Sequence, residues 1–150
     1  MKNVFILFLL LFSGIACNAQ ILRIKINQHD DDGNRHGKWI EYWDKNQQDI
    51  SGRGRYIHGK PTGKWLYFHY NGQRRLKCKY RKANTLKIKY YDIFGQIEQK
   101  GHARIDLNEV GIHYFWEGKW KFYNTRHRII RISEFNKGEE SRVIFLLEEE

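Results

Sequence analysis

The chain is poor in cysteine, in proline and in long apolar runs. Its 150 residues include two cysteines, Cys17 and Cys78, and one proline. Because Cys17 lies in a segment expected to be removed or lipidated, Cys78 has no partner, and an internal disulfide framework is excluded. No apolar run reaches the roughly 20 residues that cross a bilayer as a helix, so the sequence predicts no anchor helix.

The N-terminal segment, residues 1–19, has the pattern of an export signal. Lys2 precedes the short apolar run Val4–Phe12, and small residues follow this run. Two routes remain open, namely cleavage after Ala19 or lipidation of Cys17 in the loose lipobox SGIAC. Either route predicts a protein of the periplasm, attached to the outer membrane or secreted, in a Gram-negative bacterium.

Helical periodicity is rare in the remainder of the chain, residues 20–150. Short runs such as ILRIKIN, RLKCKYRK and RIIRISEF alternate in character and end near Gly, Asn or Asp, which predicts strands joined by tight turns. We expect a single all-β domain whose repeated β-hairpins form an elongated, twisted antiparallel meander sheet. The segment Ala103–Val110 interrupts the pattern, and we interpret it as an insertion with a helical turn.

A repeated unit organises this domain. Gly-Lys-Trp occurs at Gly37–Trp39, Gly63–Trp65 and Gly118–Trp120, each time before an aromatic run, and Leu86–Gln96 is a degraded copy. Repetition of this kind indicates architecture rather than an active site. We assign four repeats, at about 33–58, 59–82, 83–101 and 114–138.

The stretch Gly59–Trp65, GKPTGKW, has a passing likeness to a nucleotide-binding loop. Such a loop needs four residues between its glycines and a Ser or Thr hydroxyl after its lysine. Here Lys60, Pro61 and Thr62 separate the glycines, and Trp65 stands in the place of the hydroxyl. We therefore interpret the stretch as a structural turn.

The repeated unit resembles the MORN repeat, in the bacterial variant form of YwqK-type antitoxin-like proteins. The unit consists of Gly-Lys-Trp, alternating aromatics, an Asn-Gly or Phe-Gly turn and a basic strand. The positions that carry it are Gly37, Trp39, Gly63, Trp65, Tyr67, Gly72, Gly95, Gly118, Trp120 and Tyr123. The resemblance implies a hairpin-repeat fold and a binding or scaffolding role, with membrane association or antitoxin activity in some members.

The whole chain has a formal net charge of +10, and the stretch Ser51–Tyr90 contains no acidic residue. If the runs LKCKYRK and LKIKYYD pair as neighbouring strands, their lysines share one face, and like charges across a strand pair are unfavourable. This pattern favours an anionic partner. The predicted polyanion-binding residues are Arg74, Arg75, Lys77, Lys79, Arg81, Lys87 and Lys89. The alternative is that the lysines only protect a sheet edge from aggregation.

The same alternation predicts the place of Cys78. Leu76, Cys78 and Tyr80 fall on one face of the strand, and the flanking lysines fall on the other. We therefore interpret Cys78 as a core residue rather than a nucleophile.

Motifs for catalysis, cofactors or metals are lacking. The run DDDGN at Asp30–Asn34 has neither the spacing nor the distal Glu of a calcium loop, and we interpret it as a turn. His36 and His58 precede equivalent Gly-Lys pairs, but no third ligand is evident from the sequence. No nucleophile elbow or carboxylate dyad is present. The sequence thus predicts a non-enzymatic protein without a cofactor.

We expect the partner to be anionic lipid, lipopolysaccharide or an acidic glycan. Nucleic acid would suit a basic and aromatic surface, but an exported protein rarely meets it. Two alternatives remain, namely an antitoxin- or immunity-like protein that binds a protein toxin, and a purely structural envelope repeat.

Overall fold

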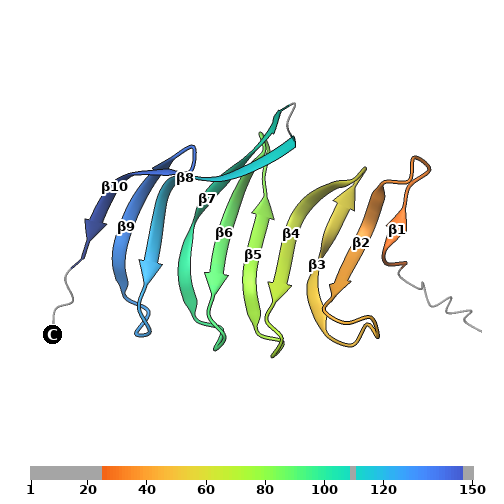
Figure 1. Cartoon of the computed structure of the whole chain (residues 1–150), viewed down its shortest axis with the longest axis horizontal. Helices are drawn as coiled ribbons and strands as arrows, with labels where there is room; N and C mark the ends of the chain where they lie inside the picture. The colour runs from red at the N-terminus through yellow and green to blue at the C-terminus, as the bar shows by residue number, and fades with distance from the viewer. Residues whose placement is uncertain (1–24, 109–110, 147–150) are drawn as a thin grey trace, which may run out of the picture.

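The chain forms one open, ten-stranded sheet, in a computed structural model that describes residues 25–108 and 111–146. The expected export signal, including Cys17, lies outside the described residues. The strands follow one another across the sheet in chain order (Figure 1). They are β1 (Gln28–His29), β2 (Arg35–Tyr42), β3 (Ile50–Ile57), β4 (Lys60–Phe68), β5 (Arg74–Tyr80), β6 (Thr85–Tyr91), β7 (Ile97–Asn108), β8 (Gly111–Tyr123), β9 (Ile129–Asn136) and β10 (Glu139–Phe145).

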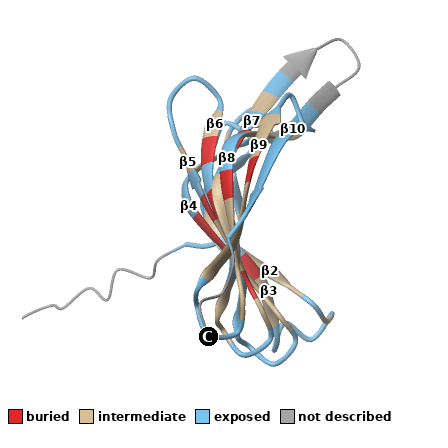
Figure 2. Cartoon of the chain, turned by 90° about the vertical axis from the view of Figure 1, so that its left-hand side faces the viewer, coloured by how far each residue is buried: buried red, intermediate tan, exposed pale blue. Residues whose placement is uncertain are grey.

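Every strand pairs antiparallel with the next, so the predicted all-β meander is confirmed. Figure 2 shows the strong twist of the sheet, with the buried residues gathered in the middle of the strands. The helical turn expected in Ala103–Val110 is wrong for residues 103–108, which belong to β7, and the last two residues of that segment lie outside the described residues. Within the described residues, no helix is long and apolar enough to span a membrane.

The turn glycines of the repeat have the backbone conformation that their turns require. In the β4–β5 turn, the His69 amide donates to the Gln73 carbonyl and the Gly72 amide to the His69 carbonyl, at 2.8 and 2.9 Å. The β6–β7 turn has the same pattern around Gly95. Gly72 and Gly95 have φ of 78° and 85°, which residues with a Cβ rarely adopt. The predicted Asn-Gly and Phe-Gly turns are therefore confirmed.

The stretch Gly59–Trp65 is only partly a turn. His58 and Gly59 form the β3–β4 turn, whereas Lys60 already belongs to β4. Arg53 pairs with Leu66 and Arg55 pairs with Thr62, so that Gly54 alone faces the three residues Gly63, Lys64 and Trp65. Gly-Lys-Trp is thus a bulge inside a strand, and the expectation that it forms a turn is wrong for these residues.

The same bulge recurs in β8. Lys100 pairs with Lys121 and His102 pairs with Glu117, so that Gly101 alone faces Gly118, Lys119 and Trp120. Gly63 and Gly118 have φ of 65° and 68°, which explains why the bulge begins with glycine. In these two copies, Gly-Lys-Trp therefore specifies a bulge within a strand rather than a turn between strands.

Each bulge places a tryptophan on a glycine of the preceding strand. Trp65 and Trp120 are both 0% exposed. Trp65 Nε1 donates to the Arg55 carbonyl at 3.0 Å, and Trp120 Nε1 donates to the His102 carbonyl at 2.8 Å. A Cβ added to Gly54 or Gly101 would lie 2.1 or 2.3 Å from the indole, so only glycine fits beneath each ring.

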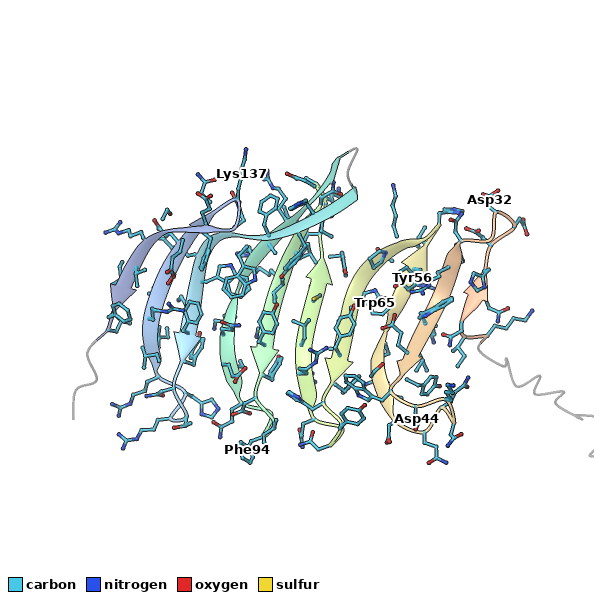
Figure 3. All side chains as sticks on the ribbon, in the orientation of Figure 1. Asp32, Asp44, Tyr56, Trp65, Phe94 and Lys137 are labelled. Carbon is cyan, nitrogen blue, oxygen red and sulfur yellow. The ribbon has the colours of Figure 1, made fainter. Side chains whose placement is uncertain are left out.

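The tryptophans belong to one aromatic face, which forms the core. Trp65 contacts Tyr56 and Tyr67, with ring centroids 4.9 and 5.8 Å apart. Trp120 stacks on Trp116 at 3.8 Å. In β2, Trp39 pairs with Gly54 from the other side and is half-buried, while its Gly37 has φ of 78°. Figure 3 shows Tyr56 and Trp65 side by side on neighbouring strands.

The third repeat lacks tryptophan, and aliphatic residues replace it. Leu86 and Ile88 of β6 are 2% and 1% exposed, and Ile88 lies opposite Cys78 of β5. Cys78 is 6% exposed, so its predicted place in the core is confirmed. The core is therefore continuous along the sheet and changes from indole rings to aliphatic side chains at its centre.

Candidate functional site

The basic face, opposite the aromatic face, carries lysines in direct register. Lys77 of β5 lies opposite Lys89 of β6, and Lys79 lies opposite Lys87. The predicted pairing of these two strands is thus confirmed. Residues directly opposite in an antiparallel pair have Cβ atoms about 4.5–5.5 Å apart, so the four ammonium groups repel one another.

The lysines continue beyond the strands that the sequence singled out. Lys100 of β7 follows Lys89 in register, and Lys121 of β8 follows Lys100. On the other side, Lys64 of β4 lies opposite Lys79. We call the whole set the lysine rows: Lys64, Lys77, Lys79, Lys87, Lys89, Lys100 and Lys121. Lys100 and Lys121 were missed because the acid-free segment ends at Tyr90, although the alternation in their strands places them on this face.

Carboxylates do not neutralise the rows. In the part of the chain that the structure describes, the ion pairs lie elsewhere, between Arg35 and Glu41, Asp30 and His58, Lys119 and Glu134, and Arg131 and Glu140. Lys79 and Lys87 are exposed, and Lys77 and Lys89 are half-buried beside them. Among the described residues, the rows therefore present positive charge without a carboxylate partner.

The rows do not guard a free edge. β5 and β6 are central strands, and each pairs with a neighbour on both sides. Lysines that prevent aggregation by edge pairing belong on the outermost strands. The interpretation of these lysines as edge protection is therefore wrong.

The predicted arginines border the rows. Arg74 and Arg75 begin β5, Arg81 follows its end, and all three are exposed. The Arg74 guanidinium lies 5.2 Å from the centre of the Tyr91 ring. The same pairing of a cation with an aromatic ring of the next strand recurs for Arg53 with Phe68 and Lys100 with Tyr123, at 5.3 and 5.0 Å. These contacts hold cations in place along one end of the basic face.

The turns at that end expose large apolar side chains. Tyr70 of the β4–β5 turn is 72% exposed and stacks on Trp43 with ring centroids 4.4 Å apart. Phe94 of the β6–β7 turn is 78% exposed and lies at the tip of its hairpin (Figure 3). Asp44 marks the neighbouring β2–β3 turn at the same end. This end of the sheet therefore carries exposed aromatic side chains.

The aromatic face contains a cleft. It has a volume of about 1100 Å³ and an apolar lining that includes Tyr67, Leu76, Tyr80, Leu86, Tyr90 and Tyr114. It lies where the third repeat has no tryptophan. Burial raises the pKa of Tyr80 to about 12, so this phenol is uncharged at neutral pH. The cleft thus combines an aromatic and aliphatic lining with the cationic side chains of Lys60, Lys79, Arg81 and Lys82.

Cys78 borders this cleft, and its surroundings disfavour a thiolate. Burial raises the pKa of the Cys78 thiol to about 11. A nucleophilic cysteine needs the opposite shift. Cys78 therefore acts as an apolar wall of the cleft.

His36 and His58 lie together, as their equivalent positions suggested, with ring centroids 5.3 Å apart. Asp30 of the β1–β2 turn joins them, with its Oδ2 2.8 Å from His58 Nδ1. Desolvation raises the pKa of the Asp30 carboxyl, but the hydrogen bond from the Asn34 amide and the contact with His58 outweigh it, so the pKa is below its usual value. The predicted turn at Asp30–Asn34 is confirmed, and it supplies a third polar group that the sequence did not place here.

No protein-family model, curated protein or solved structure matches the chain. The resemblance to MORN repeats therefore remains a prediction from the residues that carry it.

Proposed function

We propose that the chain is a non-enzymatic binding protein of the bacterial cell envelope whose basic face binds an anionic surface. The partner class comprises anionic lipid headgroups, lipopolysaccharide phosphates and acidic glycans. The observation that carries the proposal is the direct register of Lys77 with Lys89 and of Lys79 with Lys87, without carboxylates between them.

The energetics of the rows support an external anion. Each like-charged pair across two strands costs about 0.2–1 kcal/mol, and the rows contain several such pairs. Near an anionic membrane, each basic residue gains about 1 kcal/mol. An anionic surface would therefore offset the repulsion between the lysines and contribute a favourable free energy of binding.

The aromatic tips fit the same kind of partner. Tyr and Trp favour the interface between water and the apolar part of a membrane, and they also stack on sugar rings. Tyr70, Trp43 and Phe94 are exposed and lie in or next to the turns at one end of the sheet. Binding by the rows would bring these side chains to the surface of the partner.

The test is co-sedimentation of the purified protein with vesicles. Neutral and anionic vesicles are compared at low and high salt, with a variant in which Lys77, Lys79, Lys87 and Lys89 are replaced by Gln. We expect binding to anionic vesicles alone, weakened by salt because screening shortens the range of the attraction, and lost in the variant. Equal binding of the variant and the wild type would contradict the proposal.

The cleft favours a second candidate, a protein partner of the antitoxin or immunity type. Tyrosine-rich concave surfaces are typical of the centres of protein interfaces, where Tyr and Trp contribute most to affinity. Tyr67, Tyr80 and Tyr90 line such a surface here. A discrete complex that withstands salt and is lost on replacing Tyr80 by Ala would favour this candidate over the first.

A further inference from the structure

Three potential metal ligands converge at the end of the sheet that holds the β1–β2 and β3–β4 turns. Asp30 comes from the first turn, His36 from β2 and His58 from the second turn. One ligand atom of each side chain lies within 4.8 Å of the other two. The backbone fixes this meeting, because the Gly59 amide donates to the Arg35 carbonyl at 3.0 Å and so ties the second turn to β2.

His36 has an unsatisfied polar atom. Its Nδ1 is buried and has no hydrogen-bond partner in the structure. A buried polar atom without a partner costs about 1–3 kcal/mol, and such atoms are rare in folded proteins. A metal ion, which binds the lone pair of a neutral imidazole nitrogen, would remove this cost.

Asp30 is held ready for a role as a ligand. Its Oδ1 accepts a hydrogen bond from the Asn34 amide at 2.8 Å, which fixes the carboxylate plane. Its Oδ2 faces His58 Nδ1 at 2.8 Å. One oxygen is thus occupied by the backbone while the other points at the histidines, which is how outer contacts orient metal ligands in proteins.

We propose that Asp30, His36 and His58 bind a divalent transition-metal ion of the zinc class. Imidazole nitrogen with one carboxylate oxygen suits zinc, whereas calcium takes six to eight oxygens. Three protein ligands leave a fourth position for water.

The ligands need only a small movement to close around the ion. Zinc–ligand distances of about 2.0–2.1 Å place the ligand atoms of a tetrahedral site about 3.3 Å apart. In the structure, the three ligand atoms lie within 4.8 Å of one another, so they would have to approach only slightly. The His58 side chain is 67% exposed and stands on a two-residue turn, so a small shift of its ring would need little repacking.

The bound ion would link the β1–β2 turn to β2 and to the β3–β4 turn at the N-terminal edge of the sheet. β1 contains only two residues, so few backbone hydrogen bonds hold the first turn to β2. A metal ion that binds the folded chain and not the unfolded chain stabilises the folded state by mass action. The expected result is an edge that resists fraying when zinc is present.

The test is calorimetric titration of the purified protein with ZnCl₂, together with thermal unfolding with and without zinc. We expect one ion per chain and a higher Tm with zinc. His58→Asn, His36→Gln and Asp30→Asn should each lower the affinity at least tenfold, and Asn at position 30 keeps an oxygen for the Asn34 amide. The matched control is His127→Asn, an exposed histidine of the β8–β9 turn that should bind zinc like the wild type.

Two results would overturn the proposal. One is zinc binding that His58→Asn and His36→Gln leave unchanged, which would place the ion elsewhere. The other is no zinc binding below millimolar concentration, which would leave Asp30 and His58 as an ion pair only. A parallel titration with CaCl₂ should show no binding, and tighter binding of calcium than of zinc would contradict the ligand class.

Discussion

The two faces of the sheet are built from the same strands, with alternate residues used for opposite purposes. On β5 and β6, Cys78 and Ile88 lie opposite each other in the core, while Lys77 and Lys89, one residue away on each strand, lie opposite each other on the basic face and are half-buried. The aromatic face stabilises the fold by burying rings and aliphatic groups. The basic face adds repulsion and no burial of comparable size. One face therefore explains folding, and the other is the face for which we propose an anionic partner.

A second comparison separates the hairpins within the aromatic face. In β4 and β8, a fully buried indole covers a glycine of the preceding strand. At β6 the position is held by Ile88, and the cleft opens beside it. The cleft therefore borders the part of the aromatic face where the third repeat has no Gly-Lys-Trp unit.

The largest effect on folding is expected from Gly54→Ala or Gly101→Ala. The new Cβ would lie 2.1 or 2.3 Å from the indole and would displace it, breaking the hydrogen bond of its Nε1. Overpacking costs about 1–3 kcal/mol and a lost buried hydrogen bond about 1 kcal/mol, so we expect about 3 kcal/mol in total. Urea unfolding measures this change.

Gly63→Ala is the control for that prediction. Nothing lies within 4 Å of a Cβ at Gly63, so its cost comes from the positive φ of 65° alone. A left-handed conformation costs a residue with a Cβ about 1–2 kcal/mol. Equal losses for Gly54→Ala and Gly63→Ala would show that the indole does not rest on the glycine.

A smaller effect is expected from alkaline pH through Cys78. Burial raises the pKa of its thiol from 9.0 to about 11, so the folded state retains the proton longer than the unfolded state. The resulting stability is complete below about pH 9 and declines as pH rises towards 11, by about 2–3 kcal/mol at 1.36 kcal/mol per pKa unit. Unfolding of the wild type and of Cys78→Val across this range measures the difference. A constant difference between the two proteins would contradict the burial of the thiol.

Much of the fold follows from the sequence because its signals are local. Period-two alternation predicts the strands, and the glycines at 72 and 95 predict their turns. The bulge was missed because Gly-Lys-Trp resembles a turn until Gly54 is placed opposite it. Gly54 and Gly101 have no unusual φ, and only the neighbouring strand explains them.

The candidate site was predictable only in its centre. The acid-free segment revealed Lys77, Lys79, Lys87 and Lys89, but the continuation to Lys121 depends on the register of β6, β7 and β8. The meeting of Asp30 with His58 depends on two turns that are distant in sequence and adjacent in space. Such contacts between turns leave no periodic signal in the chain.

The central claim is that the lysine rows bind the anionic partner and contribute nothing to folding. The most direct test compares two variants of equal net charge. One variant replaces Lys77, Lys79, Lys87 and Lys89 by Gln. The other makes the same replacement at four exposed lysines outside the rows, namely Lys45, Lys60, Lys82 and Lys137.

The measurement is the affinity of each variant for anionic vesicles at fixed salt, with the Tm recorded on the same samples. We predict that the row variant loses binding and unfolds at the same or a higher temperature, because each like-charged pair removed relieves about 0.2–1 kcal/mol. The control variant should keep most of the affinity. Equal losses of affinity in the two variants would show that net charge alone attracts the protein, and would contradict the account.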